Sequence, residues 1–556
     1  MAMRRSKFGV LGLAAAVALV VLGVIVIASS RGSARAATPD PVACSPNTDI
    51  QTTYGPICGT SANGVREWFG IPYAAPPVGS LRWQPPQAPT PWTTTVAATS
   101  FGSSCAQQFG TFPLSGSENC LFVNVWSPAG SSTNLPVLVH IHGGGFVAGS
   151  GNGDNSLLAT RGHQVVVSLN YRLGIFGFLA DRALGPNSGD YGLQDQQAAL
   201  RWVQSNIVAF GGNPGNVTIY GESAGGSSVC DQIASPTAKG LFERGISVSG
   251  EYNTLLGTQE QAPRTPEDLE SQDCKSALPT QAQANAAGSN FAAAVGCGPG
   301  TANVLACLQA LPPSVIENAA WTPGSGYQYG AQGTVAPTIN GTTLTLSLRQ
   351  ALKAGKVNRV RVIAGTDRDE DLVGTATSAA QYQSLIDTQY GSYASEVLAR
   401  YPLSRFDSPG VAWRTVAADS DTVCPALQTD RDLASRMPTF GYEIDDNDIP
   451  PYAAAGAAVV APGASHVGAW FLTPTATPLD ANQQVLQDQE LAFVTAFSRT
   501  GNPNGNGLLA VWPRFDPSNH PSEMSLQPAG DSEVVTAAQV AAQHNCAFWD
   551  KLAPNP

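Results

Sequence analysis

The chain has little charge, few histidines and, beyond its N-terminus, no long apolar run. Charged residues make up 13% and apolar residues 43% of the 556 positions, a balance that excludes intrinsic disorder. The net charge of −12 offers no basic surface to a nucleic acid. No C-x2-C spacing occurs and the six histidines are dispersed, so we expect no metal site. After residue 28, no stretch of about 18 apolar residues predicts a further membrane span.

The N-terminus does contain one long apolar segment. Basic residues at positions 4, 5 and 7 precede an uninterrupted apolar run over 8–28, and Ala-Arg-Ala follows at 34–36. This order predicts a secretory signal peptide over residues 1–36. If it stays uncleaved, the run is long enough to anchor the chain in a membrane. In either case the rest of the chain is expected outside the cytoplasm.

All ten cysteines lie beyond this segment, and their even number is typical of a chain that folds in an oxidising compartment. Three pairs are close in sequence and would close loops of about 10 to 16 residues. They are Cys44/Cys58, Cys105/Cys120 and Cys297/Cys307.

Short β-branched runs alternate with helical patterns along the chain. Four runs are almost continuously apolar and predict strands buried on both faces: 136–142, 164–169, 216–220 and 360–364. Leucine, valine and isoleucine at 193, 200, 203 and 207 form one helical stripe within 192–210. This alternation predicts an α/β fold. Residues 252–335 are rich in Ala, Gln and Pro and predict a helical insertion with loops, and residues 37–556 show no linker that divides them into domains.

The sequence GESAGG at 221–226 is a candidate nucleophile site. It follows the predicted strand 216–220 and precedes a segment that can form a helix. A G-x-S-x-G motif is weak evidence by itself, but between a strand and a helix it predicts a sharp elbow that presents Ser223. Gly221 and Gly225 leave the space for that turn, and the N–H of Ala224 would face a bound carbonyl oxygen. The alternative is an ordinary glycine turn with a solvated serine.

The sequence HGGGF at 142–146 directly follows another predicted strand. Consecutive glycines let the backbone approach a ligand and direct N–H groups at an oxyanion. Upstream of a serine elbow, this loop is typical of the oxyanion sites of lipases and esterases. The alternative is a flexible glycine loop.

An activated serine needs a histidine base and an orienting carboxylate, which follow the serine in this architecture. Three histidines follow Ser223. We favour His466, in a Gly- and Ala-rich loop, over His520 in a polar loop and His544, which is expected to be a structural helix residue. Four acids follow the predicted strand 360–364, and the residues alone leave the choice open among Asp367, Asp369, Glu370 and Asp371.

Several segments together resemble the type-B carboxylesterase family, the cholinesterase-like branch of the α/β-hydrolase superfamily. The resemblance extends over about residues 55–515. Its segments are 69–92, 117–126, 142–146, 170–178, 193–226 and 498–504, the last followed by Trp-Pro at 512–513. It implies a large, mostly parallel central sheet flanked by helices, with helical insertions that form the substrate-access region. It also implies a serine carboxylesterase that acts on small-molecule esters, and the predicted signal peptide indicates that this enzyme is secreted. We expect no cofactor and no nucleic-acid partner.

The resemblance assigns roles to individual residues. The family's acid motif falls on 365–371 and makes Glu370 the triad carboxylate, and its G-A-x-H motif falls on 463–466 and makes His466 the base. The implied oxyanion donors are the N–H groups of Gly144, Gly145 and Ala224. Glu222 and Phe146 are secondary site candidates. The implied disulfides are Cys105–Cys120 and Cys297–Cys307; for the remaining cysteines we guess a Cys424–Cys546 pair.

The sequence departs from the family pattern at Asp371, where glycine is usual, and at Val467 and Ala469 after the proposed base. Two other functions remain open: a peptidase or amidase on the same fold, and a non-catalytic binding module. Aromatic residues at 321, 327 and 329, with Phe146, are candidates for the acyl or alcohol pocket, or else pack within the insertion.

Overall fold

A computed structural model describes residues 43–108, 113–130, 132–250, 274, 278–320, 337–370, 376–446, 478–505 and 510–552. The predicted signal peptide, His466 with its neighbours Val467 and Ala469, Asp371 and the candidate pocket aromatics at 321, 327 and 329 lie outside the described residues.

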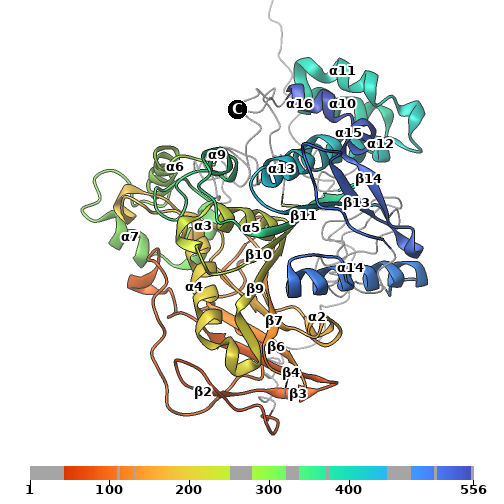
Figure 1. Ribbon diagram of the computed structural model, residues 1–556. Coiled ribbons are helices and arrows are strands. Elements are labelled where there is room, and N and C mark those ends of the chain that lie inside the picture. The colour runs from red at the N-terminus through yellow and green to blue at the C-terminus, as the bar shows by residue number, and fades with distance from the viewer. Residues whose placement is uncertain are drawn as a thin grey trace, which may run out of the picture. The chain divides into compact units, whose positions relative to one another are not determined.

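A mixed sheet of eleven strands organises the molecule (Figure 1). The strands follow the order β14-β13-β12-β11-β10-β9-β7-β8-β6-β4-β3. The seven strands from β13 to β8 are parallel to one another, and the pairs at both edges are antiparallel. Their bounds are β3 Thr60–Ala62, β4 Val65–Pro72, β6 Phe122–Pro128, β7 Leu135–Ile141, β8 Val165–Leu169, β9 Gly212–Glu222, β10 Arg244–Val248, β11 Arg361–Asp367, β12 Thr439–Ile444, β13 Ser522–Leu526 and β14 Glu533–Thr536. The predicted mostly parallel α/β sheet is therefore confirmed.

The central strands are apolar throughout because they are buried on both faces. In β7, Val137 and Val139 pack into one hydrophobic core, whereas Leu138 between them packs into a second core. Successive side chains of a strand point to opposite faces, so a strand covered on both sides needs apolar residues at every position. This is the physical reason that the four predicted runs form β7, β8, β9 and β11.

Helices cover both faces of the sheet (Figure 1). Helix α5 packs on β9 and β10, and α4 packs beside it, whereas α2 and α14 contact each other on the opposite face. The bounds are α2 Ser156–Gly162, α3 Gly174–Phe178, α4 Tyr191–Asn206, α5 Ala224–Ala234, α9 Leu348–Ala354 and α14 Ala481–Thr500. The buried Leu193, Leu200 and Val203 confirm the predicted stripe of α4.

Two helical groups lie outside these layers. In the predicted insertion, the described residues form α6 Gln281–Ala294, α7 Val304–Ala310 and α8 Pro313–Ala320. Toward the C-terminus, a third hydrophobic core joins α10 Ala379–Tyr390, α11 Ala394–Arg400, α12 Pro409–Ala418, η8 Asp419–Val423, α13 Cys424–Ala434, α15 Ala537–Gln543 and α16 Cys546–Leu552. This third core lies beside the β12–β14 edge (Figure 1).

Five disulfides pair all ten cysteines. They are Cys44–Cys58, Cys105–Cys120, Cys230–Cys274, Cys297–Cys307 and Cys424–Cys546. The first belongs to a small separate sheet of β1 Ile50–Gln51, β2 Pro56–Cys58 and β5 Val96–Ala97. This many disulfides is consistent with an extracellular protein. In the described part of the chain, no helix combines the length and apolarity needed to cross a membrane.

Candidate active site

Ser223 lies between the end of β9 and the start of α5, in a strained conformation with φ 54° and ψ −125°. The turn depends on two glycines. A Cβ on Gly221 would overlap the backbone of Gly225, and a Cβ on Gly225 would overlap the carbonyl oxygen of Ile141 in β7. The strand-to-helix elbow expected from the sequence is therefore present, and the sheet and helix hold its strain in place.

The glycine loop after β7 lies directly against this elbow. A Cβ placed on Gly143 would stand 2.6 Å from the carbonyl oxygen of Glu222 and 3.2 Å from Cβ of Ser223. The next two residues, Gly144 and Gly145, have φ angles of 101° and 62°, which favour glycine. The carbonyl of Gly144 accepts the N–H groups of Val147 and Ala148 within its own turn. The loop thus brings backbone close to Ser223 without a side chain in between.

The loop ends at Phe146, which has a positive φ of 61° and no exposed surface. Its carbonyl accepts the N–H of Gly174, and its ring packs edge-on against Phe178 at 5.1 Å. At the other end, the ring of His142 stacks on Tyr171 at 4.4 Å, and the Tyr171 hydroxyl donates to the His142 carbonyl. Both ends of the loop are therefore fixed by packing.

The start of α5 supplies further backbone donors beside Ser223. Ala224 is the first residue of the helix and is fully buried. The first intrahelical bond runs from the N–H of Ser227 to the carbonyl of Ser223. The N–H groups that precede it in a helix have no intrahelical acceptor and carry the positive end of the helix dipole. This end of α5 suits a developing negative charge.

Glu370 reaches the same region from β11. Glu370 is 2% exposed, and its Oε2 accepts hydrogen bonds from Oγ of Ser249 at 2.7 Å and Oγ1 of Thr366 at 3.1 Å. Ser249 directly follows Val248, whose carbonyl accepts the N–H of Ser223 at 2.9 Å. Strands β9, β10 and β11 are adjacent and parallel, so their C-terminal ends bring Ser223 and Glu370 to the same edge.

Two of the other acids in this turn have different surroundings. Asp367 is the last residue of β11 and is fully buried. Asp369 forms an ion pair with the neighbouring Arg368. Among the described acids of the turn, Glu370 is the one whose carboxylate is bonded to Ser249 at the end of β10.

Glu222 lies next to the serine and carries a perturbed carboxyl group. Burial, and secondly the charge of Glu370, raise its pKa to about 8. Its Oε1 is buried and makes no hydrogen bond in the described part of the chain. Glu222 therefore retains a proton near neutral pH, which keeps two negative charges from facing each other beside Ser223.

The structure places two of the three histidines that follow Ser223. His520 is exposed on a surface turn. His544 caps the end of α15 and is buried, with Nδ1 2.5 Å from Asp419 and Nε2 2.9 Å from Glu443. Burial would lower its pKa, but Asp419 and Glu443 outweigh burial and raise it well above the usual value. Both its ring nitrogens are engaged, which fits the expected structural role.

Two histidines that precede the serine, His140 and His142, are unsuited to act as a base at neutral pH. Burial lowers the pKa of both His140 and His142 to about 4. Nδ1 of His142 lies 2.8 Å from the carbonyl of Gly143. Among the described residues, no group of three His, Cys, Asp or Glu side chains could hold a metal ion.

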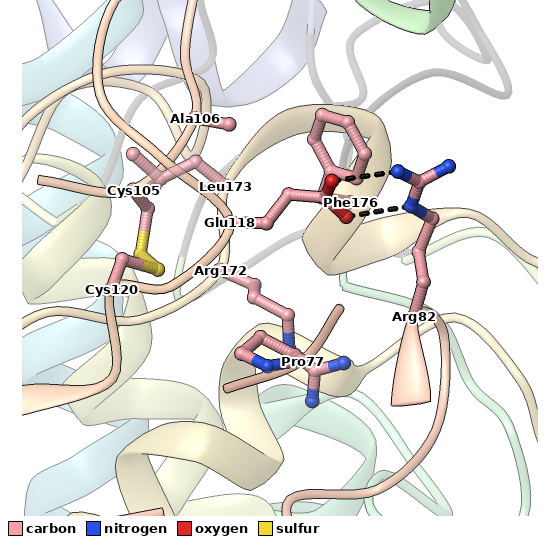
Figure 2. A pocket seen from close by; sticks show the side chains of 9 residues that line it. All are labelled: Pro77, Arg82, Cys105, Ala106, Glu118, Cys120, Arg172, Leu173 and Phe176. Carbon is pink, nitrogen blue, oxygen red and sulfur yellow. Dashed lines mark hydrogen bonds and ion pairs between the residues drawn. A yellow bond between two sulfur atoms is a disulfide. The ribbon is translucent and has the colours of Figure 1, made fainter. Parts of the chain in front are cut away.

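A small pocket flanks the loop that follows β8 (Figure 2). Arg82 and Glu118 line it and form a bidentate pair, and the Cys105–Cys120 disulfide lines it as well. Nη1 of Arg82 donates to three carbonyls of residues 308–311, and Arg172 pairs with Asp195. The charged groups of this pocket thus satisfy one another, and the pocket does not include Ser223.

Sequence reasoning missed the residues that hold the acid. Ser249 and Thr366 bond to Glu370, yet no spacing connects Ser249 with a residue 121 positions away. One feature of the sequence could have identified them. Both hydroxyl residues lie at or just after the C-terminal end of an apolar strand, and active-site side chains gather at that edge of a parallel sheet.

Comparison with known proteins finds similar sequences over most of the chain. The sequence pattern described as the carboxylesterase family matches residues 46–549. The para-nitrobenzyl esterase of Bacillus subtilis (strain 168) is 49% identical over 226 residues, which are 39% of this chain and 46% of that relative. Carboxylesterase 1D of Rattus norvegicus is 31% identical over 563 residues, which cover 90% of this chain and 93% of the relative.

A solved structure of a PNB esterase superposes with a TM-score of 0.70 at 28% identity, over 90% of this chain and 99% of that one. This likeness confirms the α/β-hydrolase fold expected from the sequence. The chain belongs to the carboxylesterase family and is a carboxylic ester hydrolase.

Proposed function

We propose that this chain is a secreted serine carboxylesterase that works through an acyl-enzyme, with Ser223 as nucleophile, His466 as base and Glu370 as orienting acid. One observation carries the proposal. The N–H of Ser223 is bonded to Val248, and the next residue, Ser249, is bonded to the carboxylate of Glu370. Nucleophile and acid are therefore held by two consecutive residues of one strand end. His466 lies outside the described residues, and its role rests on the G-A-x-H motif.

In the first half of the reaction, Oγ of Ser223 attacks the ester carbonyl as His466 takes the hydroxyl proton. The tetrahedral intermediate collapses, His466 protonates the departing alcohol, and the acyl group stays on the serine. In the second half, water attacks the acyl carbonyl and gives a proton to His466, and the serine leaves with that proton. Glu370 keeps the imidazole oriented and stabilises its charged form. No metal or organic cofactor enters these steps.

The N–H groups of Gly144, Gly145 and Ala224 are proposed to bind the oxyanion. The close approach of the glycine loop to Ser223 and the position of Ala224 at the start of α5 support this role. Each preorganised donor of this kind typically lowers the activation free energy by about 3 to 4 kcal/mol. Phe146, buried at the end of the loop, is proposed to border the acyl pocket.

The substrate class follows from the relatives. One relative is named a para-nitrobenzyl esterase, which supports small-molecule esters as the proposed substrates of this chain. The predicted signal at 1–36 and the five disulfides support secretion. The compact unit over residues 42–556 supports the proposal that residues 37–556 act as one catalytic domain. Hydrolysis rates for p-nitrophenyl esters from acetate to palmitate would define the acyl preference.

Labelling with an organophosphate, followed by peptide mapping, tests the nucleophile. We expect one label, on Ser223, and a fall in kcat of about 10⁴-fold or more for Ser223→Ala and His466→Ala. His520→Ala is the matched control because that histidine is exposed, and it should retain wild-type kcat. A label on another serine, or near-normal turnover by Ser223→Ala, would refute the assignment.

Hydrolysis of a matched ester and amide distinguishes the esterase from a peptidase or amidase on the same fold. We expect the p-nitrophenyl ester to be cleaved with a much higher kcat/KM than the corresponding p-nitroanilide. A higher kcat/KM for the anilide would instead support the amidase alternative.

A further inference from the structure

The turn that carries Glu370 is fastened to the neighbouring strand by one arginine. Arg368 is the first residue after β11, and its backbone N–H donates to the carbonyl of Ile444 at the end of β12, at 2.9 Å. Its Nε lies 2.6 Å from Oδ2 of Asp369, and its Nη1 forms an ion pair with Asp445. The backbone of Arg368 is therefore bonded to the last residue of β12, and its side chain is paired with the residue that follows β12.

This ion pair is partly withdrawn from water. The side chains of Arg368 and Asp445 are 18% and 24% exposed, compared with 45% and 57% in the surface pair Arg161–Asp488. Burial by itself would lower the pKa of Arg368, but Asp369 and Asp445 outweigh it and raise the pKa. Water screens a partly buried pair less than a surface pair, so its geometry is held more firmly.

Asp445 is itself fixed to a third strand. Its N–H donates to the carbonyl of Leu526, the last residue of β13, at 2.8 Å. Burial raises the pKa of Asp445, so loss of its cationic partner would leave a half-buried carboxylate uncompensated. The ends of β11, β12 and β13 are thus joined by Arg368 and Asp445 together.

The position of the pair in the sequence links it to catalysis. Glu370, the proposed acid, comes two residues after Arg368, and His466, the proposed base, comes 21 residues after Asp445. Both proposed catalytic residues therefore follow one member of this pair in the sequence. A displacement of about 1 Å between catalytic groups is enough to lower a rate by about 100-fold.

We infer that Arg368 is a positioning residue for ester hydrolysis. Its ion pair with Asp445 sets the position of the turn that bears Glu370 relative to the end of β12, the strand that precedes the proposed base in the sequence. This inference rests on the proposed triad. Arg368 is not one of the three proposed catalytic residues, so we expect it to act on the rate through Glu370 and to leave substrate binding unchanged.

The alternative is that the pair only adds stability, as an ion pair elsewhere would. The molecule contains a matched control for that role. Arg349 of α9 pairs with Asp432 of α13 at 3.2 Å, with side chains 7% and 32% exposed. Neither residue belongs to the strand ends that carry Ser223 or Glu370. Arg349→Gln therefore removes an ion pair that does not belong to those strand ends.

The test compares Arg368→Gln, Asp445→Asn, the double variant, Arg368→Lys and Arg349→Gln in the full chain. The concentration of active sites is measured from the burst of p-nitrophenol that a p-nitrophenyl organophosphate releases. The value of kcat then refers to the folded, competent enzyme alone. We expect Arg368→Gln and Asp445→Asn to lower kcat by about 10- to 100-fold with KM within about twofold of wild type. The double variant should be no worse than the stronger single variant, because the two residues act through one bond.

Arg368→Lys retains the charge with one contact fewer and should recover part of the lost rate. Arg349→Gln should lower the melting temperature while its kcat per active site stays at the wild-type value. Asp445→Asn leaves the Arg368–Asp369 bond in place, so it tests the same inference if Arg368→Gln does not fold.

Glu370→Gln, measured in parallel, separates the two ways this can fail. If Glu370→Gln is inactive but Arg368→Gln and Asp445→Asn keep wild-type kcat, or lose no more than Arg349→Gln, the positioning role is wrong and the triad stands. If Glu370→Gln keeps wild-type kcat, the proposed acid is wrong and the positioning role falls with it.

Discussion

Oγ of Ser249 donates a 2.7 Å hydrogen bond to Oε2 of Glu370, although the two residues are 121 positions apart. Ser249 has a φ angle of 43°, and the φ angles of Ser223 and Phe146 are positive as well. Three strained non-glycine residues therefore lie around one site. Strain of this kind persists only where the surrounding structure holds it and tends to accompany function. The Ser249–Glu370 bond is the side-chain contact that links the proposed acid to the strand end beside the nucleophile elbow.

Ser249→Ala removes this bond and should lower kcat by about tenfold, with KM little changed. A hydrogen bond to a charged group contributes about 1.5 to 3 kcal/mol, and its loss lets the carboxylate of Glu370 shift. Steady-state kinetics with p-nitrophenyl acetate measures the effect. Ser188→Ala removes another buried hydroxyl bond, away from the site, and serves as control. Equal kcat in Ser249→Ala and wild type would contradict the role of this bond.

Gly225→Ala should damage both stability and activity. The new Cβ would overlap the carbonyl oxygen of Ile141, so α5 and the elbow must move away from β7. We expect a loss of about 1 to 3 kcal/mol or more in unfolding free energy and a fall in kcat of about 100-fold. Thermal unfolding and ester hydrolysis report the two effects. Gly153→Ala is the control, because its Cβ meets no atom within 4 Å; equal behaviour of the two variants would show that the elbow tolerates displacement.

Glu317→Gln tests the pH dependence of stability. Glu317 of α8 is 3% exposed, its Oε1 makes no hydrogen bond in the described part of the chain, and burial raises its pKa to about 8 from 4.5. The folded state therefore binds this proton more tightly than the unfolded state does. The stabilising contribution of the proton is full below pH 4.5, falls as pH rises toward 8, and is absent above that.

Glutamine stays neutral, so Glu317→Gln should gain unfolding free energy relative to wild type as pH rises from 4.5 to 8, by several kcal/mol in total. Urea unfolding at pH 5, 7 and 8.5 gives the difference at each pH. The exposed Glu533→Gln should show no such trend. A difference between Glu317→Gln and wild type that does not change with pH would contradict a buried, uncompensated carboxyl.

The contributions of the disulfides should follow loop length. Cys424–Cys546 closes a separation of 122 residues and Cys44–Cys58 one of 14. The chain-entropy relation gives about 5 kcal/mol for the longer loop and about 3 kcal/mol for the shorter. Replacing each pair by serines should therefore lower the melting temperature more for Cys424/Cys546. The reverse order would show that native-state contacts, rather than loop closure, dominate.

Strands and the elbow were predictable because their causes are local. A strand covered on both faces needs apolar residues at consecutive positions, and β7, β8, β9 and β11 have them. The elbow needs glycines at 221 and 225, where a Cβ would overlap neighbouring backbone. Each requirement is met within a few residues, so it is visible in the sequence.

The choice among the acids was not local. Asp367, Asp369 and Glu370 lie within four positions, and their spacing does not distinguish them. The difference comes from other strands: Arg368 pairs with Asp369 and with Asp445 of the β12 end, and Ser249 of the β10 end bonds to Glu370. A resemblance to a known family selected Glu370, and only the neighbouring strands explain why its carboxylate is the one bonded to Ser249.

The cysteines show the same division. The three pairs that are close in sequence all form disulfides, because a short loop brings its own ends together. Cys230–Cys274 was not foreseen, since it depends on the packing of α5 beside β10. Cys274 lies near the carbonyl of Gly250, just beyond β10, and Cys230 lies on α5.

By itself, the sequence determined the α/β alternation, the glycine-dependent turns and the serine presented between a strand and a helix, because hydrophobic pattern and the lack of a Cβ act over neighbouring positions. Only the tertiary structure decided which partners hold Glu370, how Arg368 and Asp445 together join three strand ends, and that His544 is held between Asp419 and Glu443. Those outcomes depend on distances between segments that are far apart in the chain. Such distances are fixed only when the parallel strands align their C-terminal ends and the side chains there are buried from water.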